Sequence, residues 1–248
     1  MSLATEGQLF EIGHDRGPNA TGWRRDIDDA LELAAGLNHG PITPAVAGAW
    51  AALESLLAIS QDSDESEGHV SAARRAAALV ACSWPRAELT ALSYRVAAGK
   101  SRALDESLAA SESNRDRAEV IQSHIRQYGG IPIERGWRLS SDSAAVQRMK
   151  GLIENPRPVL KDVHDYAESA LRRLYRHRNI ILHGGAPSDR STGPGLRLAA
   201  PLVGAALDRI THAAFVRQVA PLELAAQAEV ALNLAGDAMG RDICALLE

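Results

Sequence analysis

One helical segment carries an arginine and a histidine whose residue types and spacing could serve anion binding and proton transfer. Over residues 159–183 apolar side chains recur every three or four positions, which is typical of a helix with one buried face. The pattern calls for an apolar residue at position 178, and the sequence has Arg178. A guanidinium keeps its charge, so a sheltered one needs an anionic partner or ligand. His183 follows five residues later, and its imidazole titrates near neutral pH, which suits proton transfer.

The residues around this pair are strongly basic, although the whole chain has a net charge of −4. Such a local patch is the expected footprint for a phosphate-bearing partner. Helical geometry predicts that Arg178 points inward, while Arg172, Arg176 and Asn179 share another face. Aromatic side chains for base stacking are scarce here, which predicts that any base preference is weak or comes from a partner. The candidate nucleic-acid-binding residues are Arg172, Arg173, Tyr175, Arg176 and His177.

A second charged residue, this time acidic, interrupts the apolar pattern of an earlier helix. The helical pattern that begins at Pro44 places Glu54 one turn after Trp50, at the border of the buried stripe. A Glu54–Arg178 ion pair would satisfy both misplaced charges. Two interpretations stay open: such a pair is often an ordinary salt bridge between helices, and His183 could simply cap the end of its helix.

The elements that must position these residues are predicted to be helices throughout. The chain has 248 residues, of which 44 are alanine, the best helix former, and β-branched residues are sparse. The fold class is therefore predicted to be all-α. Pro85 is expected to open a new helix, and a Pro/Ser/Gly loop is expected through residue 195. The predicted helices cover residues 26–37, 44–57, 69–81, 85–98, 101–113, 116–128, 141–153, 159–183, 200–216, 222–234 and 241–247.

Composition and segment lengths exclude several classes of protein. No apolar run reaches 18 residues, which excludes a membrane-spanning helix, and the start lacks a signal-peptide pattern, so we expect a cytoplasmic protein. Cys82 and Cys244 are too few for a disulfide framework or a cysteine-rich zinc site, and are expected to be reduced packing residues. Residues 1–42 are expected to form a leader with a short helix, as the end of an upstream region would, and residues 43–248 the main domain.

The segment from Leu174 to Gly185 resembles the signature of the HEPN superfamily, especially its Apea-like branch. That signature is an arginine, four to six residues that often begin with asparagine, and then a histidine. Here it is Arg178-Asn-Ile-Ile-Leu-His183. The segment Ala49–Leu57 is similar to the early helix of this branch, whose glutamate faces the motif. The resemblance covers roughly residues 43–240.

This resemblance implies a HEPN-like helical bundle with additional helices, which forms a homodimer and brings two motifs together. Active members are metal-independent endoribonucleases of toxin–antitoxin, CRISPR-associated and anti-phage systems. The resemblance implies no cofactor, RNA as substrate, and an antitoxin or defence protein as a further partner. It implies that His183 moves a proton, Arg178 stabilises the phosphorane, Asn179 contacts the phosphate or orients His183, Glu54 holds Arg178, and Arg172, Arg173 and Arg176 attract the RNA strand.

Two rival interpretations remain. A catalytically inactive module of the same family would bind RNA, a nucleotide or a protein partner within a defence or toxin–antitoxin complex. A metal-dependent phosphohydrolase of the HD type would use the dyad His164-Asp165, but it needs further ligands, and neither His124 nor Asp189 supplies a convincing set. His164 and Asp165 are therefore expected to be ordinary polar positions on the outer face of their helix.

Overall fold

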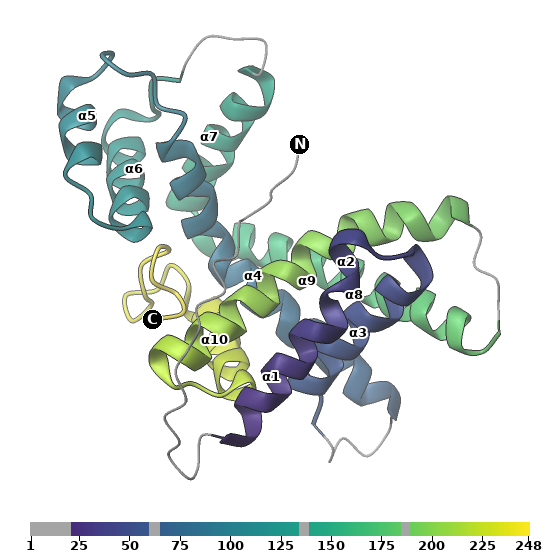
Figure 1. Cartoon of the computed structure of the whole chain (residues 1–248). Helices are drawn as coiled ribbons and strands as arrows, with labels where there is room; N and C mark the ends of the chain where they lie inside the picture. The colour runs from purple at the N-terminus through teal and green to yellow at the C-terminus, as the bar shows by residue number, and fades with distance from the viewer. Residues whose placement is uncertain (1–20, 60–64, 134–138, 185–188) are drawn as a thin grey trace.

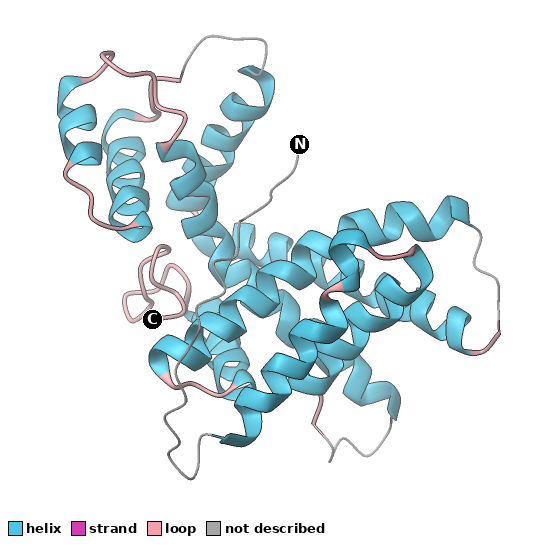
Figure 2. Cartoon of the chain, viewed as in Figure 1, coloured by secondary structure: helices cyan, strands magenta, loops and turns pink. Residues whose placement is uncertain are grey.

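The structure is a computed structural model, and it describes residues 21–59, 65–133, 139–184 and 189–248. Within these ranges the chain consists of helices joined by loops and turns, without strands (Figure 2). Val96 and Ile133 form a single isolated antiparallel bridge. This confirms the predicted all-α class. The helices are α1 (Thr21–Ala34), α2 (Gly36–His39), α3 (Ile42–Leu57), α4 (Glu65–Ser93), α5 (Arg102–Ala109), α6 (Asn114–Tyr128), α7 (Leu139–Glu154), α8 (Pro156–Leu182), α9 (Asp189–Arg217) and α10 (Pro221–Leu234).

Helix α4 is the centre of the fold. It packs against α3, α6, α7, α8, α9 and α10, and all seven residues from Ala76 to Cys82 are buried. A helix that is apolar on every side is expected to lie inside a protein. Figure 1 shows α5, α6 and α7 gathered on one side of the molecule, while α1, α2, α3, α8, α9 and α10 form the larger bundle on the other. No helix in the described ranges is long and apolar enough to span a membrane.

The predicted helix boundaries are wrong in three places. Residues 65–93 form one helix, so Pro85 does not separate two helices; it lies inside α4, where burial on many sides compensates for the lost hydrogen bond. Helix α9 begins at Asp189 and includes Pro194 and Pro201, so most of the loop expected before residue 195 is helical. Residues 241–247 form turns rather than a short helix.

Helix α1 belongs to the same hydrophobic core as the rest of the bundle. Ile27 and Ala30 are fully buried there, and α1 crosses α3 where Gly48 of α3 meets the carbonyl of Leu33. A β-carbon at Gly48 would lie 2.2 Å from that oxygen, so the close crossing requires glycine. The domain boundary expected at residue 42 stays a prediction, and residues 1–20 of the expected leader lie outside the described part of the chain.

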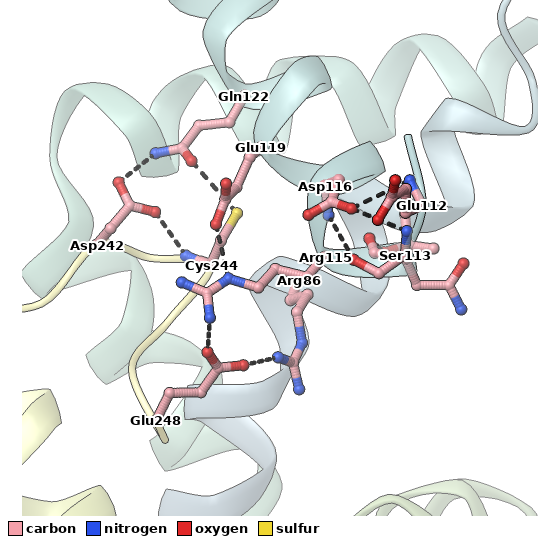
Figure 3. Close-up of polar contacts among 12 residues, drawn as sticks. Arg86, Glu112, Ser113, Arg115, Asp116, Glu119, Gln122, Asp242, Cys244 and Glu248 are labelled. Atoms are coloured by element: carbon pink, nitrogen blue, oxygen red, sulfur yellow. Dashed lines mark hydrogen bonds and ion pairs between the residues drawn. The ribbon is translucent and has the colours of Figure 1, made fainter. Parts of the chain in front are cut away.

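The C-terminal segment ties α4 to α6. The carboxylate of Glu248 forms ion pairs with Arg86 of α4 and Arg115 of α6, as Figure 3 shows. The Sγ atom of Cys244 donates to Oε1 of Gln122 at 3.3 Å, and the amide of Gln122 donates to Asp242 at 2.8 Å. Side-chain contacts therefore hold this non-helical segment against helices whose residues lie more than one hundred positions earlier in the sequence.

Candidate functional site

Helices α3 and α8 pack against each other and bring together the two charges that interrupt their apolar stripes. Nη2 of Arg178 lies 3.8 Å from Oε2 of Glu54. The two side chains are 27% and 25% exposed, so the pair is sheltered but still reaches water. The predicted Glu54–Arg178 ion pair is thereby confirmed. At this separation the contact is a charge–charge attraction between helices rather than a short hydrogen bond.

Arg178 has a second partner on its own helix. Its Nη1 donates to Oδ1 of Asn179 at 3.1 Å. A guanidinium carries five N–H donors, so these two partners do not use its full capacity to hold an anion. The Arg178 head group is thus fixed from two directions, by a carboxylate on α3 and by an amide on α8.

The helix carrying these residues stops where the sequence predicts. His183 is the C-cap of α8, and its backbone N–H donates to the carbonyl of Asn179 at 3.0 Å. Gly184 follows with φ +76°, a left-handed conformation that glycine adopts without strain. The imidazole of His183 is exposed to solvent. Gly185, the second glycine of the motif, lies outside the described residues.

Arg178 and His183 do not share a face of α8. Five residues at about 100° each place their β-carbons about 140° apart around the helix axis. His183 falls instead on the side of Arg172 and Arg176. Arg172 and Arg176 are four residues apart, and Arg176 and His183 are seven apart, and both spacings return to the same face of a helix. Within a single chain, Arg178 therefore lies beside Glu54, whereas His183 points in a different direction at the end of α8.

The other predicted binding residues divide into exposed and packed groups. Arg172, Arg173 and Arg176 are exposed; Arg172 pairs with Glu168 at 2.5 Å, and Nε of Arg173 donates to the carbonyl of Ser169 at 3.3 Å. They form the solvent-facing basic surface of α8. Figure 1 shows helix α8 within the larger bundle, away from α5 and α6.

Tyr175 and His177 are only partly exposed, whereas side chains that stack on bases must be open to solvent. The ring of Tyr175 packs 5.0 Å from the buried ring of Trp50 on α3, centroid to centroid. His177 faces Gly195 of α9, where an added β-carbon would lie 3.5 Å from Nε2 of the imidazole. Tyr175 therefore contributes to the packing of α8 against α3, and His177 contributes to the packing of α8 against α9.

A third group on α8 was only partly anticipated. The sequence drew attention to His164 and Asp165, but Glu168, one turn later, completes a compact cluster with them. Spacing of four residues between His164 and Glu168 is the signal that could have revealed it. This cluster lies two turns or more along α8 from Arg178.

Comparison of the chain with protein-family models, with curated proteins and with solved structures gives no match. The functional interpretation therefore depends on the geometry of α3 and α8 and on the resemblance of the motif they carry.

Proposed function

We propose that the protein is a metal-independent endoribonuclease of the HEPN type. The observation that carries the proposal is the contact between Glu54 and Arg178, because it joins the two charged residues that the family motif would use. A half-sheltered ion pair of this kind contributes only about 0–1 kcal/mol to stability, so stability alone is a weak reason to keep two charges on core-facing stripes.

The side chains fit the chemistry of metal-free RNA cleavage. The 2′-oxygen of a ribose attacks the adjacent phosphorus, its proton leaves to a base, and the bond to the 5′-oxygen breaks as that oxygen gains a proton. The products are a 2′,3′-cyclic phosphate and a 5′-hydroxyl. In the proposal His183 transfers the proton, Arg178 stabilises the charged phosphorane, and Asn179 contacts the phosphate or orients His183. Glu54 is a positioning residue, which holds the guanidinium fork.

The divergence of Arg178 and His183 around α8 supports a site built from two chains. In a homodimer with the α8 ends adjacent, the arginine of one copy and the histidine of the other can approach the same phosphate. The exposed Arg172, Arg173 and Arg176 would attract the strand to this junction. Such an enzyme would act in the cytoplasm as a toxin or anti-phage effector, with an antitoxin or defence protein as its partner.

A catalytically inactive binding module is the second candidate. It is favoured by the exposure of His183 and by its angular separation from Arg178 within one chain. Such a module would use the same basic surface to bind RNA, a nucleotide or a protein partner, without cleavage.

A cleavage assay in EDTA distinguishes the two. The purified full chain would be incubated with a mixed RNA pool beside Arg178→Ala and His183→Ala, and product ends would be mapped for cyclic phosphate. Arg102→Ala, which removes an exposed arginine of α5 far from the motif, is the matched control. Cleavage by wild type and control but not by the two site variants supports the enzyme. No cleavage by a folded dimer supports the binding module, and cleavage that persists in both site variants refutes the proposed site.

A further inference from the structure

An open groove with a volume of about 590 Å³ lies between α8 and α10, apart from the Glu54–Arg178 contact. Its α8 wall consists of Arg157, Lys161, His164 and Asp165, its α10 wall of Glu229, Leu232 and Asn233, and Arg74 of α4, which pairs with Glu229, completes the lining. The groove therefore has an imidazole and a carboxylate on one side and further oxygen-bearing side chains on the other. These are side chains that bind divalent metal ions in proteins.

Three side chains on α8 already lie at distances that suit a metal ion. Nδ1 of His164 is 3.3 Å from Oδ1 of Asp165 and 3.9 Å from Oε2 of Glu168. One ligand atom from each of the three can be chosen so that all lie within 4.8 Å of one another. Around a tetrahedral ion with bonds of about 2.1 Å, ligand atoms are about 3.4 Å apart. Small side-chain adjustments would therefore close the three groups around one ion.

The local sequence explains why the cluster is preformed. Residues 164 and 168 are four apart and lie on one face of the helix, and their side chains are only 16% and 17% exposed. The carboxylates at present have cationic partners from the same helix: Lys161 pairs with Asp165, and Arg172 pairs with Glu168 at 2.5 Å. A divalent ion would take the place of these cations and would not leave a sheltered charge uncompensated.

We propose that His164, Asp165 and Glu168 form a binding site for a divalent transition-metal ion, with Zn²⁺ as the best fit. One imidazole nitrogen and two carboxylate oxygens suit Zn²⁺, whereas Mg²⁺ prefers an octahedral shell of oxygen ligands. The remaining coordination position faces the groove, where water or a side chain of α10 completes the shell. This inference is independent of the proposed RNA cleavage, which uses other residues and proceeds in EDTA.

Zinc titration of the full chain tests the site, after removal of any affinity tag and dialysis against a chelator. Calorimetry should give one equivalent of Zn²⁺ bound, with at least about tenfold weaker binding of Mg²⁺. At a free Zn²⁺ concentration of 100 times Kd, the folding equilibrium constant should rise about 100-fold, which is measurable as a higher Tm. Four-coordinate Co²⁺ at the same site should show visible absorption that Zn²⁺ abolishes.

Two variants and one control assign the ligands. His164→Ala and Glu168→Gln should each weaken Zn²⁺ binding at least about tenfold, because each removes one of three ligands. His39→Ala removes an exposed histidine of α2 and should leave the affinity unchanged. Circular dichroism checks that each variant is folded. If His164→Ala does not fold, Glu168→Gln tests the site alone, because glutamine has nearly the same shape as glutamate. Equal affinity in wild type and both variants, or equal binding of Mg²⁺ and Zn²⁺, overturns the proposal.

Discussion

Replacing Arg178 with methionine separates a structural role from a catalytic one. Methionine keeps a long unbranched side chain at position 178 but removes the partner of Glu54, whose Oε2 lies 3.8 Å from Nη2. At this distance the gross attraction is about 4 kcal/mol for an effective dielectric constant of about 20, and about 1 kcal/mol in water. Desolvation and side-chain ordering oppose it, so the expected net loss for a pair that is about a quarter exposed is at most about 1 kcal/mol.

The apolar replacement also recovers part of that loss. Position 178 is close to the stripe of Leu171 and Leu174, which are buried, so a methionine side chain gains contacts there. We expect the free energy of unfolding to change by no more than about 1 kcal/mol in either direction. For a chain of this size that corresponds to a Tm change within about 2–4 °C. Loss of a group that stabilises transition-state charge, in contrast, should lower the cleavage rate by about 100- to 1,000-fold.

Thermal unfolding and single-turnover cleavage in EDTA measure the two quantities on the same samples. Glu54→Gln and the double variant with Arg178→Met complete a double-mutant cycle, whose coupling term reports the pair itself. Unchanged Tm with lost cleavage supports the catalytic role. Retention of wild-type cleavage by Arg178→Met would refute the reasoning, as would a fall in Tm of more than about 10 °C with cleavage lost only in proportion to the unfolded fraction.

Three further predictions follow from the exposure of other side chains. His183→Ala should leave the free energy of unfolding within about 0.5 kcal/mol, since the imidazole is exposed, and lower cleavage by about 100- to 10,000-fold. Arg172→Ala and Arg176→Ala should each weaken RNA binding irrespective of sequence and reduce the slope of log K against log salt by about 0.7, as measured by fluorescence anisotropy. Burial raises the pKa of the Cys82 and Cys244 thiols from 9.0 to about 12, so iodoacetamide at pH 9 should alkylate the native protein about 500-fold more slowly than the unfolded chain, as followed by mass spectrometry.

Each of these has an internal control. His39→Ala serves for His183, and Arg102→Ala serves for Arg172, because Arg102 is also exposed and also pairs with a glutamate four residues away. An equal loss of RNA affinity in Arg102→Ala would show a general charge effect and contradict a binding surface on α8. For the thiols, rapid native alkylation would show that the C-terminal segment opens readily.

The sign of the thiol contribution to stability also follows. The folded-state pKa of Cys82 and Cys244 lies above the unfolded value, so the folded state keeps its protons where the unfolded chain loses them. This contribution is therefore complete below about pH 9 and lost as the pH rises toward 12. Alkaline unfolding should begin within that interval.

Periodicity predicted the all-α class and the helix that carries the candidate site, because a long amphipathic stripe is a strong signal. The same stripe predicted the Glu54–Arg178 contact, since both charges were out of place on their helices. Continuity through Pro85 was not predictable, because it depends on packing around α4 that the local sequence does not contain. The groove between α8 and α10 likewise needed the fold, since Glu229 lies more than sixty residues after His164 in sequence.

The alanine-rich centre of α4 has a consequence for how this protein tolerates change. Between Ala72 and Ala81 most of the buried side chains are single methyl groups, and neighbouring helices approach them closely. Replacement by leucine or phenylalanine would force the helices apart and cost about 1–3 kcal/mol or more, whereas glycine would cost about 1 kcal/mol through helix propensity. Tolerance at these positions should therefore follow side-chain volume rather than hydrophobicity. Sequence variation in relatives of this protein is expected to exchange alanine with serine, glycine and cysteine, and an overly large apolar residue should be as harmful there as a charge.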